Sequence, residues 1–157
     1  MTDVPEPAEP DATPRLIAEP AGGVPRVTDT PAGLEACAAA LAVLKVFDEE
    51  NLLARSNAVG EKLKAGLNKI AEKHKVIGDV RGLGSMVAIE LFEGGDHSKP
   101  AAELVGKIVA RAREKGLILL SCGTYYNVIR FLMPVTIPDA QLEKGIAIVA
   151  ECFDELA

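Results

Sequence analysis

The amino-acid sequence predicts an α+β fold in which a small, mostly antiparallel sheet carries helices on one face. Apolar residues recur with helical spacing in four segments, and they alternate with period two in short runs. The expected order from residue 34 is α-α-β-β-α-β-β-α, and short strands with helices gathered between them are typical of this class. The length of 157 residues favours one domain with a single core.

Residues 1–33 are expected to form a flexible tail that precedes a folded domain at 34–157. The first 31 residues hold seven of the ten prolines and show neither helical nor strand periodicity. They carry six acidic and two basic residues, so −4 of the net charge of −6 lies there. Such a composition buries too little apolar surface to offset the entropy of ordering the chain.

The first two helices are expected at residues 34–50 and 51–74. The first is apolar on almost every side until Asp48, and a helix of that kind must be covered on several sides. It serves either as the core helix of this domain or as a surface for another domain, and composition does not separate the two. The second is amphipathic, with a buried stripe formed by Leu52, Ser56, Val59, Leu63, Leu67 and Ile70.

The remaining elements follow in order. Residues 76–84 and 85–91 are predicted strands, and Gly82 and Gly84 between them allow a tight turn or a close approach of another group. Pro100 is expected to open a helix that Gly116 ends. Two short strands fill residues 116–137, with a turn at 122–126. The last helix is expected at 136–156, with apolar residues at Leu142, Ile146, Val149, Phe153 and Leu156.

Arg130 is the candidate binding residue. The strand that carries it places Val128, Arg130 and Leu132 on one face, so a permanent charge sits in an otherwise apolar strand. Removing that charge from water without a partner costs several kcal/mol. The partner is either a fixed carboxylate such as Glu90 or a ligand carboxylate or phosphate, because the planar guanidinium suits both.

The run SCGTYYNVIR at residues 121–130 closely resembles the substrate-carboxylate strand of 4-aminobutyrate aminotransferases. These are class III, fold type I enzymes that use pyridoxal phosphate. The resemblance also includes residues 37–47, 80–91 and 115–120, and it extends over residues 36–157. It matches only the C-terminal end of much longer chains. It implies that Arg130 binds the substrate carboxylate and that the first helix joins this small domain to a large one.

The resemblance also implies a lysine that binds the cofactor, placed before a Ser-x-Ala-Gly-Gly-x-Pro run. One alignment equates residues 21–25 with that run and puts Ala18 at the lysine position. Another equates residues 21–33 with a later glycine-rich loop, and Thr30 then takes the place of the threonine that contacts the cofactor phosphate. Leu34-Glu35 departs from the Asn-Pro of that loop. The first lysine of the chain is Lys45, inside a helix, so we expect no pyridoxal phosphate bound to this chain alone and no activity.

Three functional hypotheses follow. The chain is the C-terminal domain of an enzyme that transfers the amino group of 4-aminobutyrate to 2-oxoglutarate, the complementing subunit of a split aminotransferase, or a non-catalytic domain that senses small carboxylates. The expected ligands are 4-aminobutyrate, glutamate and 2-oxoglutarate. The apolar first helix predicts self-association or pairing with a large domain.

Several functional classes are disfavoured. The net charge of −6 without a basic cluster argues against nucleic acid. No apolar run approaches membrane-spanning length, and the N-terminus lacks the basic and apolar regions of a secretion signal, so a cytoplasmic location is expected. Cys37, Cys122 and Cys152 lack metal-type spacing and are expected to be thiols, with no metal site.

Overall fold

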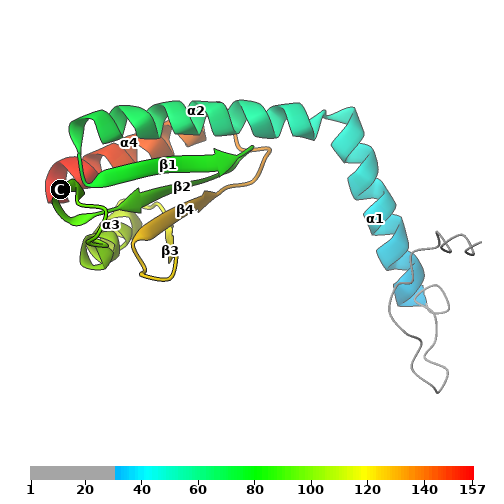
Figure 1. Cartoon of the computed structure of the whole chain (residues 1–157). Helices are drawn as coiled ribbons and strands as arrows, with labels where there is room; N and C mark the ends of the chain where they lie inside the picture. The colour runs from blue at the N-terminus through cyan, green and yellow to red at the C-terminus, as the bar shows by residue number, and fades with distance from the viewer. Residues whose placement is uncertain (1–30) are drawn as a thin grey trace, which may run out of the picture. The chain divides into compact units, whose positions relative to one another are not determined.

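The computed structural model describes residues 31–157 (Figure 1). Its helices are α1 (Pro31–Glu49), α2 (Leu52–Lys73), the short 3-10 helix η2 (Glu93–Gly95), α3 (Ala102–Glu114) and α4 (Asp139–Leu156). Its strands are β1 (Ile77–Leu83), β2 (Met86–Leu91), β3 (Leu120–Cys122) and β4 (Val128–Leu132). The first part of α1 and the segment from Leu44 onward belong to different compact units, so α1 is described by itself.

The four strands form one antiparallel sheet in the order β1-β2-β4-β3. Helix α2 packs on β1 and β2, α3 packs on β2, β3 and β4, and α4 packs against α2 and α3. The inward side chains of the two central strands are fully buried or nearly so; they are Val87, Ile89, Leu91, Ile129 and Phe131. The α+β class with an antiparallel sheet and helices on one face is thus confirmed (Figure 1).

The core lies between that face of the sheet and the three helices. Leu63 and Leu67 of α2, Ile108 of α3 and Phe153 of α4 are almost completely buried there. The apolar stripes expected for these three helices supply most of the core, because residues three and four apart share one side of a helix. The sheet and the three helices therefore fold around one apolar centre.

Three predicted helix starts are wrong by two or three residues. Helix α1 begins at Pro31, inside the predicted tail, where a proline is tolerated because the first N–H of a helix needs no partner. Helix α3 begins at Ala102, because Pro100 forms an isolated bridge with Phe92. Helix α4 begins at Asp139, because Pro138 before it is extended. The rest of the predicted tail lies outside the described residues.

The end of α3 follows the prediction. Gly116 adopts φ 85°, a left-handed conformation that glycine reaches at little cost. Its N–H donates to the carbonyl of Arg113 at 3.0 Å, and the N–H of Leu117 donates to the carbonyl of Ala112 at 2.8 Å. These bonds satisfy carbonyl groups that a helix end leaves free. The chain is thereby redirected into the segment that leads to β3.

Helix α1 contributes nothing to the described core. Gly33 is the only buried residue of α1. Leu41, Val43 and Leu44 are more than half exposed, and Val46 and Phe47 are about 40% exposed. No residue of α1 is part of the apolar core that α2, α3, α4 and the sheet form.

Candidate functional site

The face of the sheet opposite the helices is open, and its side chains lie in cross-strand rows. The ladders align Leu83 with Met86 and Met86 with Leu132 in one row. The next row runs from β1 to β3 as Arg81, Ala88, Arg130 and Leu120. Leu83, Met86, Leu120 and Leu132 are at least half exposed. A guanidinium thus stands in the middle of an uncovered apolar surface, and we call the residues of these two rows the open face.

Arg130 itself is exposed and has no hydrogen-bond or ion-pair partner within residues 31–157. It lines a depression of about 250 Å³ together with residues 117–120 and 131–133. The alternation that put Val128, Arg130 and Leu132 on one face of β4 is confirmed by the ladder. The expectation that the guanidinium is removed from water is wrong for this chain, because no described element covers that face.

Glu90 is not the partner of Arg130. Its Oε2 accepts a hydrogen bond from Arg81 Nη1 at 2.7 Å, and Arg81 Nη1 also donates to Asp79 Oδ2 at 2.5 Å. The bond to Asp79, and next the bond to Glu90, raise the pKa of Arg81 above its usual value. The alternative of a structural ion pair between Arg130 and Glu90 is therefore wrong, because that carboxylate is already occupied.

Asn127 ties this ion-paired group to the start of β4. It is 1% exposed, and its Nδ2 donates to Glu90 Oε1 at 3.2 Å and to the carbonyl of Leu91 at 3.1 Å. Neither Arg81 nor Asn127 is predicted from the sequence to be a member of the site. Asp79 and Arg81 two residues apart on one strand were a usable signal, since period two places them on the same face.

The turn before β4 has a backbone that few residues adopt. Gly123 has φ 85° and Tyr126 has φ 54°, and the N–H of Tyr126 donates to the carbonyl of Gly123 at 3.1 Å. A bulky residue at positive φ is energetically costly and persists where its surroundings hold it. Asn127, the next residue in the chain, is buried and hydrogen-bonded, and it holds the end of this turn in place. Tyr125 and Tyr126 project mostly into solvent, with 65% and 69% exposure.

No lysine lies on any of the four strands, since all occur in helices or connecting segments. Thr30 lies outside the described residues. Within residues 31–157 no group of three or more His, Cys, Asp or Glu side chains is placed to hold a metal ion. In the same range no helix is long and apolar enough to cross a membrane.

Most of the chain matches one known protein family. The family model described as aminotransferase class-III matches residues 32–153. The chain belongs to the class-III aminotransferases. Members of this family use pyridoxal phosphate. The match covers all of α1 except Pro31, and every strand of the sheet, so the open face and Arg130 lie inside it.

Two curated relatives are highly similar to the chain. A 5-aminovalerate aminotransferase of Pseudomonas aeruginosa is 88% identical over 122 residues, which are 78% of this chain and 29% of that protein. A 4-aminobutyrate aminotransferase of Escherichia coli is 68% identical over 120 residues, or 76% of this chain and 28% of that protein. The chain therefore spans less than a third of the length of these relatives.

Solved structures show the same fold. A Bacillus anthracis aminotransferase superposes with a TM-score of 0.71 at 27% identity, covering 81% of this chain and 29% of that one. An amine transaminase from an uncultivated Pseudomonas species, with pyridoxal phosphate bound as the internal aldimine, gives 0.69 at 30% identity over 78% of this chain and 28% of its own. The described residues do not fit the cofactor by themselves, because the open face offers no lysine.

Proposed function

We propose that this chain supplies the substrate-carboxylate subsite of an aminotransferase that acts on ω-amino acids such as 4-aminobutyrate or 5-aminovalerate. Arg130 is the residue that binds the carboxylate. The single observation that carries this proposal is a guanidinium without a partner in residues 31–157, set in the middle of an apolar sheet face.

Most of the other arginines in the described chain, unlike Arg130, are paired with carboxylates. Arg55, Arg81 and Arg111 are each bound to one or two carboxylates. Within the described residues only Arg113 and Arg130 lack such a partner, and Arg113 lies on α3. A rigid strand holds Arg130, and its planar guanidinium can donate two parallel hydrogen bonds to a carboxylate. Apolar neighbours strengthen such a pair once a ligand or another domain displaces water.

The amino-group transfer itself requires groups that the described residues do not provide. The cofactor supplies that chemistry in this family, and the lysine that binds it is not on the open face of this chain. We therefore propose that the chain is inactive alone and that its contribution is to bind and orient the carboxylate. Thr30 remains our proposed contact to the cofactor phosphate, by resemblance.

A second candidate function is that of a complementing subunit of a split aminotransferase. It is favoured by two exposed apolar surfaces, the open face and α1, each of which suits contact with a large partner domain. A free-standing carboxylate sensor is less favoured, because such a protein gains solubility from polar residues on α1. Co-purification of a separate large-domain chain with pyridoxal phosphate distinguishes the second candidate.

The experiment that tests the carboxylate subsite is an NMR shift titration of the chain with 4-aminobutyrate, glutamate and 2-oxoglutarate. A charge-assisted pair contributes about 1.5–3 kcal/mol, so we expect affinity in the millimolar range or weaker. Shifts should map to β3 and β4. They should disappear in Arg130→Met and persist in Arg113→Met, a control that removes an equally unpaired guanidinium from another element.

Two results contradict the proposal. Equal binding by the parent and by Arg130→Met would show that the acids bind elsewhere. If Arg113→Met weakens binding as much as Arg130→Met does, the acids are attracted by the net charge of the chain and not by a specific subsite.

A further inference from the structure

Glu90 of β2 lies diagonally opposite two arginines, one on each neighbouring strand. Ala88, which is two residues from Glu90 and points to the same face of the sheet, pairs with Arg81 of β1 and with Arg130 of β4. Diagonal neighbours on adjacent strands are about 7–8 Å apart, a gap that long side chains bridge. The carboxylate of Glu90 is therefore within reach of either guanidinium.

In the structure Glu90 is bound to Arg81. Its Oε2 accepts a hydrogen bond from Arg81 Nη1 at 2.7 Å, and its Oε1 accepts one from Asn127 Nδ2 at 3.2 Å. The side chain of Glu90 is 24% exposed. Because both carboxylate oxygens are held, Glu90 does not turn toward Arg130.

The residues directly opposite Glu90 explain why Arg81 is the partner. On β1 this residue is Asp79, and its Oδ2 accepts a second hydrogen bond from Arg81 Nη1. On β4 it is Val128, which is apolar and 5% exposed. Arg81 thus interacts with two carboxylates, and hydrogen bonds between charged groups are the strong ones. Val128 offers Arg130 no such group.

We propose that Arg81 is a positioning residue: it holds Glu90 away from Arg130 and so keeps that guanidinium available to the carboxylate of an ω-amino acid. This inference rests on the proposed function, because it concerns the same subsite. A carboxylate attached to the protein acts at an effective concentration in the millimolar range or above, and the expected affinity for the ligand is itself about millimolar. A released Glu90 would therefore compete effectively with the ligand.

The first test is an NMR shift titration of the full chain with 4-aminobutyrate at constant ionic strength. Arg81→Met releases Glu90, so the affinity should fall about tenfold relative to the parent. The Arg81 side chain is 48% exposed, so its replacement should leave the fold intact, and the backbone amide spectrum checks this. An affinity equal to that of the parent would overturn the role of Arg81.

Two double variants separate competition by Glu90 from an effect of net charge. Arg81→Met with Glu90→Gln removes the competing carboxylate, so the affinity should return toward that of the parent. Arg81→Met with Asp79→Asn has the same formal charge as the first double variant but keeps Glu90, so its affinity should stay low. Equal recovery in both would show that only the net charge matters, and it would overturn the proposal.

The second test needs no ligand, because the Nε–Hε resonance of Arg130 reports its pairing directly. In the parent, Glu90→Gln should leave this resonance where it is, since Glu90 is bound to Arg81. In the Arg81→Met background, the same change should shift it, since Glu90 is then free to pair with Arg130. A resonance that responds to Glu90→Gln in both backgrounds, or in neither, would overturn the proposal.

The two tests distinguish failure of this inference from failure of the carboxylate subsite. A parent that binds no acid contradicts the proposed function, and the Arg130 resonance still decides whether Arg81 holds Glu90 away. A parent that binds 4-aminobutyrate through Arg130 supports the subsite, and equal binding by Arg81→Met then removes only the role of Arg81.

Discussion

A methyl group placed on Gly60 of α2 would lie 1.8 Å from the carbonyl oxygen of Gly84 in the β1–β2 turn. The two backbones are in direct contact there, and Ser56 reinforces the junction. Its Oγ accepts a hydrogen bond from the backbone N–H of Ser85 at 3.0 Å and lies 3.2 Å from the hydroxyl of Ser85. This contact holds α2 against the turn from which β2 enters the open face.

Gly60→Ala should therefore destabilise the chain although alanine favours helix. Overpacking of this kind costs roughly 1–3 kcal/mol, because the turn must move away. Gly106 of α3 is the matched control, since a Cβ there meets nothing within 4 Å. Gly106→Ala should stabilise by about 0.5–1 kcal/mol. Urea unfolding measures both, and a Gly60→Ala protein at least as stable as the parent would contradict this account of the contact.

The sequence was sufficient to predict the fold class but not the state of the site. Alternation placed Val128, Arg130 and Leu132 on one face, because period two is a local property of a strand. Whether anything covers that face depends on the whole fold, so the exposure of Arg130 was not predictable. The pairing of Arg81 with Glu90 depends on the register of β1 on β2, which the sequence does not specify. The contact of Gly60 with Gly84 was equally hidden, although Gly84 was expected to allow a close approach.

Replacing Asn127 should destabilise the chain, whereas replacing Arg130 should leave its stability almost unchanged. Asn127 is buried and donates two hydrogen bonds, so Asn127→Ala should cost about 1–3 kcal/mol of unfolding free energy. Arg130 is exposed and lacks a partner in the described chain, so Arg130→Met should change stability by less than about 0.5 kcal/mol. Chemical denaturation compares them. A loss of about 3–5 kcal/mol in Arg130→Met would reveal a buried carboxylate left without its cation.

The three cysteines should react with a thiol reagent in a fixed order. Cys37 is exposed, Cys122 is half-buried and Cys152 is buried, and burial raises the pKa of the Cys152 thiol. The thiolate is the reactive species, so Cys152 should be modified only when the domain unfolds. Mass spectrometry after timed labelling, with and without denaturant, follows each site. Modification of Cys152 at the rate of Cys37 under native conditions would show that α4 opens freely.

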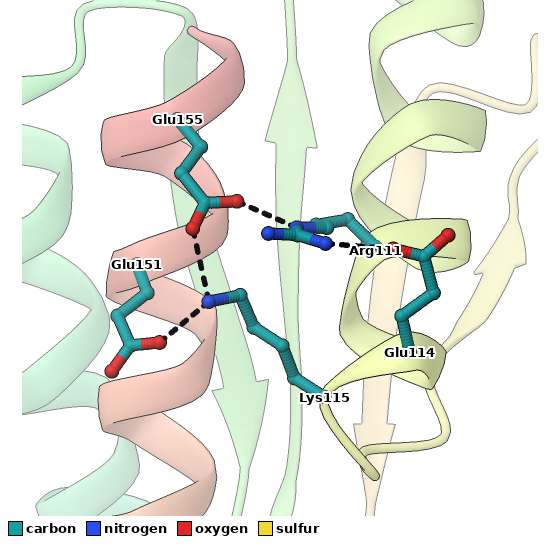
Figure 2. Close-up of polar contacts among 5 residues, drawn as sticks. All are labelled: Arg111, Glu114, Lys115, Glu151 and Glu155. Carbon is teal, nitrogen blue, oxygen red and sulfur yellow. Dashed lines mark hydrogen bonds and ion pairs between the residues drawn. The ribbon is translucent and has the colours of Figure 1, made fainter.

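Figure 2 shows five charged side chains that join the end of α3 to α4. Arg111 Nε donates to Glu155 Oε2 at 2.6 Å, and Arg111 Nη1 donates to Glu114 Oε2 at 2.8 Å. Lys115 Nζ lies 2.7 Å from Glu151 Oε2 and 3.0 Å from Glu155 Oε1. Glu155 thus contacts two cations, and the hydrogen bond from Arg111, followed by that from Lys115, lowers its pKa from 4.5 to about 2.

Glu155 should therefore make the stability of the chain depend on acid pH. A carboxyl group whose pKa is lower in the folded state contributes stability that is fully present above its unfolded pKa, here 4.5, and is lost as the pH falls through about 2. The difference in unfolding free energy between the parent and Glu155→Gln should be largest above pH 4.5 and shrink toward pH 2. The other acidic groups with lowered pKa are common to both proteins and cancel in the difference; they are Asp96, Glu103, Asp139 and Asp154. Glu155 and the two cations that it contacts are partly exposed, so the measurement should be made at low salt. Salt at about 1 M should reduce the difference. A difference that does not change with pH would show that the contacts of Glu155 in Figure 2 do not persist in solution.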